Sequence, residues 1–185
     1  MYSRYAHQFS EIPATLAEVP ELREEILRLI DAEPMAGKVT EGGDRLDNFR
    51  LILRQLVTGE IDLSAAYYLT ERELPRSQSI HAADNRVFPS GWAERLVRTQ
   101  FSRFYNQAIM EDSMNDGETE CYVPHSSEED GNSECSLTLA GRTHDLKLLH
   151  DRLIASYRNG NWSREPKIPG HPHCTHVITP TREIR

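Results

Sequence analysis

The sequence lacks the short motifs that identify most common enzyme mechanisms. It contains no glycine-rich phosphate-binding loop, no Gly-x-Ser-x-Gly turn and no His-Glu-x-x-His motif. Nucleotide-binding, serine-hydrolase and zinc-peptidase mechanisms therefore have no support from sequence. The Cys-x2-Cys pair that many zinc sites carry is also missing. What remains informative is the fold class and the places where reactive side chains gather.

Long apolar runs are missing too. No stretch approaches the roughly 18 to 20 apolar residues that a membrane-spanning helix needs, and residues 1–7 do not resemble a signal peptide. We therefore expect a cytoplasmic protein with no membrane contact. In a reducing compartment, three cysteines are more often thiols, metal ligands or nucleophiles than disulfide partners.

Positive charge is in deficit. The 185 residues include 29 Asp and Glu against 21 Lys and Arg, a net charge of -8. Proteins that bind duplex nucleic acid usually present clustered Lys and Arg to the phosphates. A nucleic-acid partner is therefore unlikely by composition, and a nucleic-acid-binding factor is the third-ranked hypothesis. Its candidate contacts are Arg95, Arg98 and Arg103 on one side of a predicted helix, next to Trp92.

The composition, 38% hydrophobic and 27% charged, is typical of a single globular domain, which we expect to span residues 1–185. Within it, residues 1–70 form a predicted helical part. Leu and Ile recur at helical spacing between Pro20 and Pro34. A second helix is predicted to begin after Asp44 and to end at Gly59, and Asp62 is predicted to cap a third.

Residues 70–90 lose this periodicity and contain two prolines, which predicts a long loop. The spacing of apolar residues in 91–113 predicts the longest helix. Its apolar side includes Phe101, Phe104 and Tyr105, so we expect it to be the central helix of the core.

Residues 119–180 predict a small α+β part with the element order β-β-α-β. Residues 121–123 and 136–140 are expected to pair as a hairpin, residues 143–158 to form a helix, and residues 174–179 to form a last strand. The predicted fold class is therefore α+β, with an N-terminal helical part and a long central helix packed against a small C-terminal sheet.

Residues 121–176 hold all three cysteines and six of the eight histidines. Alternation along a strand places Cys174 and His176 on one face, and Cys121 and Cys135 would meet across the predicted hairpin. A Cys3His set suits tetrahedral zinc, with His173 as a further candidate ligand. The alternative is that the cysteines are small buried hydrophobic residues.

Three functions follow from these features. The leading hypothesis is an intracellular, non-enzymatic protein that binds a protein partner and has a Cys/His-rich, zinc-stabilised C-terminal half. The alternative is a small metal- or cysteine-dependent hydrolase with its site near residues 171–176, where Cys174 would be the nucleophile. The third is the nucleic-acid-binding factor described above.

Overall fold

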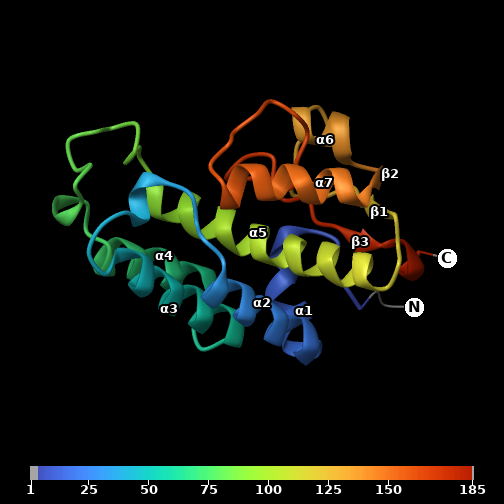
Figure 1. Cartoon of the computed structure of the whole chain (residues 1–185), viewed down its shortest axis with the longest axis horizontal. Coiled ribbons are helices and arrows are strands. Elements are labelled where there is room, and N and C mark those ends of the chain that lie inside the picture. The colour runs from blue at the N-terminus through green and yellow to red at the C-terminus, as the bar shows by residue number, and fades with distance from the viewer. Residues whose placement is uncertain (1–3, 185) are drawn as a thin grey trace.

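A 24-residue helix, α5 (Trp92–Asn115), runs through the middle of the molecule. In the computed structural model, which describes residues 4–184, the other N-terminal helices lie on one side of α5, and α7 and the sheet lie on the other (Figure 1). The N-terminal helices are α1 (Ile12–Glu18), α2 (Pro20–Ala32), α3 (Arg45–Thr58) and α4 (Leu63–Glu73). This arrangement confirms the predicted α+β class and the central position of the long helix.

The middle of α5 is buried around its whole circumference, because it has neighbours on both sides. Its apolar residues, including Phe101 and Phe104, belong to the main core. The polar residues of this stretch are buried as well, and two of them, Arg103 and Asn106, bond to other segments of the chain. Asn106 Oδ1 accepts a hydrogen bond from the backbone N–H of Ile178 at 2.9 Å. The helix thereby fixes the C-terminal segment that carries Cys174 and His176.

The helix boundaries predicted for the N-terminal part are close to those observed. Gly59 ends α3 in the left-handed conformation, with φ 76°. Asp62 caps α4, because its Oδ1 accepts a hydrogen bond from the backbone N–H of Ala65 at 2.8 Å. Asp44 lies at the start of α3, but its side chain makes no capping hydrogen bond. The capping role predicted for Asp44 was therefore wrong.

This difference between the two aspartates gives a matched test. Asp62→Ala should lower the free energy of unfolding by about 1 kcal/mol, because an N–H in the first turn of α4 loses its acceptor. Asp44→Ala should change it by less than about 0.5 kcal/mol. Denaturant titration of both variants measures the difference, and equal losses would contradict the assigned cap.

Residues 74–91 contain no α-helix or strand, and this segment projects from one end of the molecule (Figure 1). The loop predicted for residues 70–90 therefore begins four residues later than expected, because residues 70–73 belong to the last turn of α4. Arg76 holds it together by donating hydrogen bonds to the carbonyl of Ala82 and to Asn85 Oδ1, each at 2.7 Å. Its guanidinium also lies 5.6 Å from the centre of the Phe88 ring. The loop is long, but it has its own internal contacts.

The sheet has three antiparallel strands in the order β2-β1-β3, namely β1 (Glu120–Val123), β2 (Arg142–Asp145) and β3 (Thr179–Pro180). Its second strand is not where the sequence predicts it. Residues 136–140 belong to a short helix, α6 (Glu134–Leu139), capped by Ser133. The predicted last strand is also shorter, since only its end, at Thr179, pairs with β1.

The buried residues explain why α6 is a helix. Cys135 and Leu139 are buried and four positions apart, whereas Leu137 is 58% exposed. This is a helical spacing, and the apparent two-residue alternation of Leu137 and Leu139 does not reflect burial. Helix α7 (Leu146–Leu153) follows β2 and is capped by Asp145. It continues as a π-helical turn over Ile154–Arg158. Among residues 4–184, no helix combines the length and the apolar content needed to cross a membrane.

Candidate metal centre

Four side chains from the C-terminal half converge on one point. One donor atom from each of Glu129, Cys135, Cys174 and His176 lies within 4.8 Å of the others. Cys135, Cys174 and His176 are buried, and Glu129 is partly buried. Thiolate, imidazole and carboxylate are all metal ligands. The group could therefore hold a metal ion.

The segment before β3 carries two of these residues and is held on several sides. The backbone N–H and the hydroxyl of Thr175 donate to Glu129 Oε2 at 3.1 and 3.2 Å. On the other side, the carbonyl of Thr175 accepts from the backbone N–H of Phe9 at 2.9 Å. Because Thr175 lies between Cys174 and His176, these bonds set the positions of both neighbours.

The orientation of His176 suits a metal ligand. Its Nδ1 faces the group, 3.7 Å from Cys174 Sγ and 4.0 Å from Glu129 Oε2. Its Nε2 lies 3.4 Å from Ser136 Oγ. With the proton on Nε2 and donated to Ser136, the Nδ1 lone pair is free to bind a cation. Metal-binding histidines usually show this division between the two ring nitrogens.

His171 lies at the edge of the group in a different role. Its Nδ1 accepts a hydrogen bond from the backbone N–H of His173 at 3.2 Å, which places the proton of the neutral ring on Nε2. That Nε2 lies 3.3 Å from Cys135 Sγ and 3.5 Å from Glu129 Oε1. His171 therefore donates to the sulfur and lies beside the carboxylate, and it supports the ligands instead of joining them.

The two thiols of the group affect each other strongly. A hydrogen bond from Cys174 lowers the pKa of Cys135 to about 5, and Ser133 and His171 act in the same direction. The same bond, together with burial, raises the pKa of Cys174 well above its ordinary value. These directions favour a thiolate at Cys135 beside a protonated Cys174 thiol. A bound cation would replace the proton of that thiol.

Glu129 is also held in its charged form. Burial by itself raises the pKa of Glu129, but hydrogen bonds from Thr175 and the proximity of His171 and His176 bring it below the ordinary value. A carboxylate that is ionised and already oriented can bind a cation with little rearrangement.

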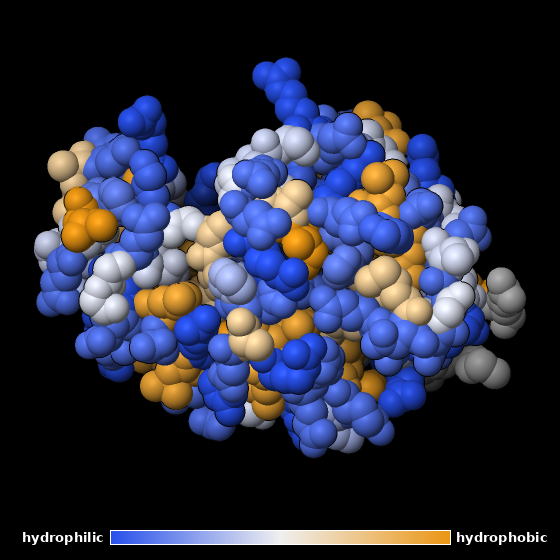
Figure 2. Space-filling view, viewed as in Figure 1, coloured by the Kyte–Doolittle hydropathy of each residue, from blue (hydrophilic) through white to orange (hydrophobic). Residues whose placement is uncertain are grey.

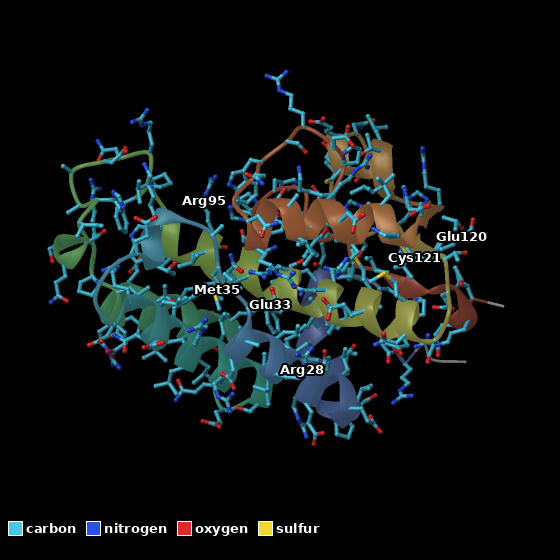
Figure 3. All side chains as sticks on the ribbon, in the orientation of Figure 1. Arg28, Glu33, Met35, Arg95, Glu120 and Cys121 are labelled. Carbon is cyan, nitrogen blue, oxygen red and sulfur yellow. The ribbon has the colours of Figure 1, made fainter. Side chains whose placement is uncertain are left out.

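Three of the five metal ligands predicted from sequence come together here, and two lie elsewhere. Cys121, which is labelled in Figure 3, is fully buried on β1. Its partners in the sheet are His144 on β2 and Pro180 on β3. Burial raises the pKa of Cys121 to about 12. His173 is exposed. Cys121 was expected to face Cys135 across a hairpin, but β1 pairs with β2, and residue 135 lies on α6.

Two residues of the centre were not among the metal ligands predicted from sequence. Glu129 is one of three consecutive acidic residues in a turn-rich segment, and nothing in that pattern separates it from its neighbours. His171 lies in the stretch 171–176 that was expected to hold the site of the alternative hydrolase, but it was not predicted to bind the metal. Only the fold of residues 124–133 and 170–176 brings these two side chains to the cysteines.

A cavity of about 380 Å³ lies beside the centre. Cys135 and His171 line it, whereas Cys174 and His176 do not. The remaining wall is formed by α6 and by residues 163–170, with Thr138 and Lys167 among the lining residues. Of the two cysteines in the centre, Cys135 is thus the one in contact with this open space.

The three arginines considered for nucleic-acid binding do not share an exposed face. Arg95 points away from α5 (Figure 3) and is exposed. Arg98 is partly buried, with its guanidinium 4.2 Å from the centre of the Phe9 ring. Arg103 is fully buried and donates to the carbonyls of Pro34 and Tyr157 at 2.8 and 3.1 Å. Only Arg95 is free to meet a phosphate.

Comparison with protein-family models, with curated proteins and with solved structures found no match to this chain. The arguments for function therefore come from the geometry of the centre and of the surface around it.

Proposed function

We propose that this chain is a zinc-binding protein in which Glu129, Cys135, Cys174 and His176 hold the ion. The observation that carries the proposal is the convergence of these four donors within 4.8 Å. Two thiolates favour zinc over the hard cations calcium and magnesium, and four donors match the tetrahedral coordination of zinc. The outward nitrogen of His176 and the N–H of His171 supply the supporting hydrogen bonds that such sites have.

The zinc ion has a structural role in this proposal. Four protein ligands fill a tetrahedral site, and no position then remains for a substrate. The ligands also come from three pieces of chain with little regular structure: a loop, the six-residue helix α6, and the segment before β3. Since β3 has only two residues, few sheet hydrogen bonds hold these pieces together. The zinc ion would link these three pieces of chain through its bonds to the ligands.

We further propose that the zinc-held half binds a protein partner in the cytoplasm. Supporting this, Leu137, Leu148 and Trp162 are 58%, 48% and 60% exposed, and all three lie in this half of the chain. Figure 2 shows hydrophobic residues among hydrophilic ones where α6 and α7 lie. Exposed large apolar side chains are common at the centre of protein interfaces. The three cysteines are free thiols, which suits a reducing compartment.

A hydrolase is the second candidate, and the cavity beside Cys135 and His171 favours it. The details weigh against the mechanism expected from sequence, in which Cys174 is the nucleophile. His171 already carries a proton on the nitrogen that faces Cys135, so it cannot accept one there as a general base. Cys174, the nucleophile expected from sequence, is buried, does not line the cavity and has a raised pKa.

Elemental analysis tests the zinc proposal directly. The chain should be purified without a histidine tag, without added metal and without chelators, and is expected to contain one zinc ion per molecule. Removing the ion with a chelator should lower the melting temperature, and adding zinc back should restore it. A chain that contains no zinc and is not stabilised by added zinc would contradict the proposal.

The supporting bond to His176 gives a more specific prediction. Ser136→Ala removes the acceptor of the Nε2 proton and should weaken zinc binding by about 10- to 100-fold. Thr138→Ala is the matched control, since it removes a hydroxyl from the same helix whose bond is to the carbonyl of Glu134. Competition with a chromogenic chelator measures both affinities. Equal affinities for the two variants would show that Ser136 does not support the ligand.

A further inference from the structure

The position of Cys135 has a chemical consequence beyond zinc binding. We infer that Cys135 is a site of oxidation by hydroperoxides, that Cys174 is the thiol that resolves it into a disulfide, and that this disulfide expels the zinc ion. The last step depends on the proposed zinc function, whereas the first two depend only on the arrangement of the thiols and the cavity.

Cys135 and Cys174 differ in their access to the cavity. Cys135 lines the cavity of about 380 Å³, which is large enough to admit a small peroxide. Cys174 is buried behind it and does not line the cavity. The third cysteine, Cys121, is fully buried in the sheet. A reagent that enters the cavity therefore meets Cys135 first.

The groups around Cys135 suit this reaction. The Nε2–H of His171 points at its sulfur from 3.3 Å, and Ser133 Oγ lies at 3.3 Å as well. Such donors stabilise a thiolate, which is the reactive form. His171 also lines the cavity, so its N–H can be donated to an oxygen atom that leaves during the reaction. His171 therefore acts as a catalytic residue in this reaction.

The reaction can be written in two steps. The Cys135 thiolate attacks one oxygen of the hydroperoxide, and the O–O bond breaks. The other oxygen leaves as an alcohol, or as water from hydrogen peroxide, after taking up a proton. The sulfur is oxidised to a sulfenic acid. Cys174 then attacks this sulfur, the S–O bond breaks, and hydroxide leaves as water with the second proton. Two thiolates, one hydroperoxide and two protons thus give one disulfide, one alcohol and one water.

The second step is possible because the two sulfurs are neighbours. Both Sγ atoms belong to the group of donor atoms that lie within 4.8 Å of one another, so side-chain rotation can bring them to the S–S distance of about 2.05 Å. The disulfide removes both thiolates from the ligand set. Glu129 and His176 alone do not provide a zinc site of the original affinity, so the ion is released.

The experiment uses the full chain, loaded with zinc or stripped of it, and hydrogen peroxide as the oxidant. In both forms, two of the three thiols should be lost, and peptide mapping should show a disulfide between Cys135 and Cys174 with Cys121 still reduced. In the loaded form, a chromogenic chelator should detect one zinc ion released for each disulfide formed. This mapping needs no variant, so it does not depend on a variant that folds.

Variants then test the order of events. In Cys174→Ser, a dimedone-type reagent should trap the sulfenic acid on Cys135. In Cys135→Ser, the thiol at position 174 should be oxidised about tenfold more slowly than Cys135 in the parent. Cys121→Ser should oxidise at the parent rate. His171→Gln should slow the first step while the same disulfide still forms.

Three results would overturn the inference: oxidation of Cys174 or Cys121 before Cys135, conversion of Cys135 to a sulfinic acid with the Cys174 thiol intact, or retention of zinc after the disulfide has formed. Failure of the proposed function is seen separately. A chain that never binds zinc but forms the Cys135–Cys174 disulfide supports the oxidation site and contradicts the zinc function.

Discussion

Cys174→Ser should purify without a full equivalent of zinc and should melt about 8–16 °C below the zinc-loaded parent. A ligand present at about 1,000 times its dissociation constant adds about 4 kcal/mol to the free energy of unfolding. In a chain of 185 residues, each kcal/mol corresponds to about 2–4 °C. Losing one of two thiolates removes most of this term, because the remaining donors bind the ion far more weakly.

Cys121→Ala is the matched control for this result. Cys121 is as buried as Cys174, but it lies on β1 outside the group of donors. Its replacement should cost about 1 kcal/mol of packing and leave the zinc content unchanged. Elemental analysis and thermal melting, each with and without added zinc, measure both effects. If Cys174→Ser keeps its zinc, or if Cys121→Ala loses it, the ligand set is wrong.

Glu33→Ala should lower the free energy of unfolding by about 3 kcal/mol, through a buried ion network that joins the end of α2 to α5 and to the turn after α7. Glu33 accepts hydrogen bonds from Arg103 Nη2, at 3.3 Å, and from the guanidinium of Arg158. Burial lowers the pKa of Arg103 to about 10, and the charge of Glu33 acts against this shift. Removing Glu33 leaves the Arg103 charge without its carboxylate, which is costly in a buried site.

The loss should lie toward the lower end of the range for broken buried ion pairs, since Arg103 keeps the carbonyls of Pro34 and Tyr157 as acceptors. Asp31→Ala is the control on the same helix. Asp31 pairs with Arg54 at the surface, at 2.5 Å, and exposed pairs of this kind contribute at most about 1 kcal/mol. Chemical denaturation should therefore show a clear difference between the two variants. Equal losses would mean that Glu33 does not stabilise the buried arginine.

The helices of the N-terminal part could be predicted because their patterns are local. Helical spacing of Leu and Ile defines α2 and α3, and Gly59 and Asp62 mark chain positions that only a few residue types suit. Residues 136–140 could not be assigned in this way. Within residues 135–139, the spacing of Leu137 and Leu139 matches a strand, while the spacing of Cys135 and Leu139 matches a helix. The choice depends on which side chains the rest of the chain buries.

Only some residues of the candidate metal centre could be predicted from the sequence, because most of their contacts are not local. Cys135, Cys174 and His176 are of types that rarely occur together without a role, so composition pointed to them. Glu129 is one acid among 29 Asp and Glu residues, and only its contacts with Thr175 distinguish it. Arg103 is a residue whose sequence pattern suggested the wrong environment. Its spacing suggested an exposed basic face, but its partners come from segments 69 and 54 residues away in the chain.

The contacts between the two ends of the described chain constrain the order in which the molecule can fold. The guanidinium of Arg182 donates to the hydroxyl of Tyr5, 177 residues away, and the backbone N–H of Phe9 donates to the carbonyl of Thr175. The contacts among α2, α3 and α4 instead join neighbours in sequence. Short loops close faster and at lower entropic cost than long ones. The helices between residues 12 and 73 can therefore assemble while the chain is still being synthesised. The segment around Thr175 can fold into place only when both ends of the described chain are present. Until then, Cys135 and Cys174 are accessible to solvent.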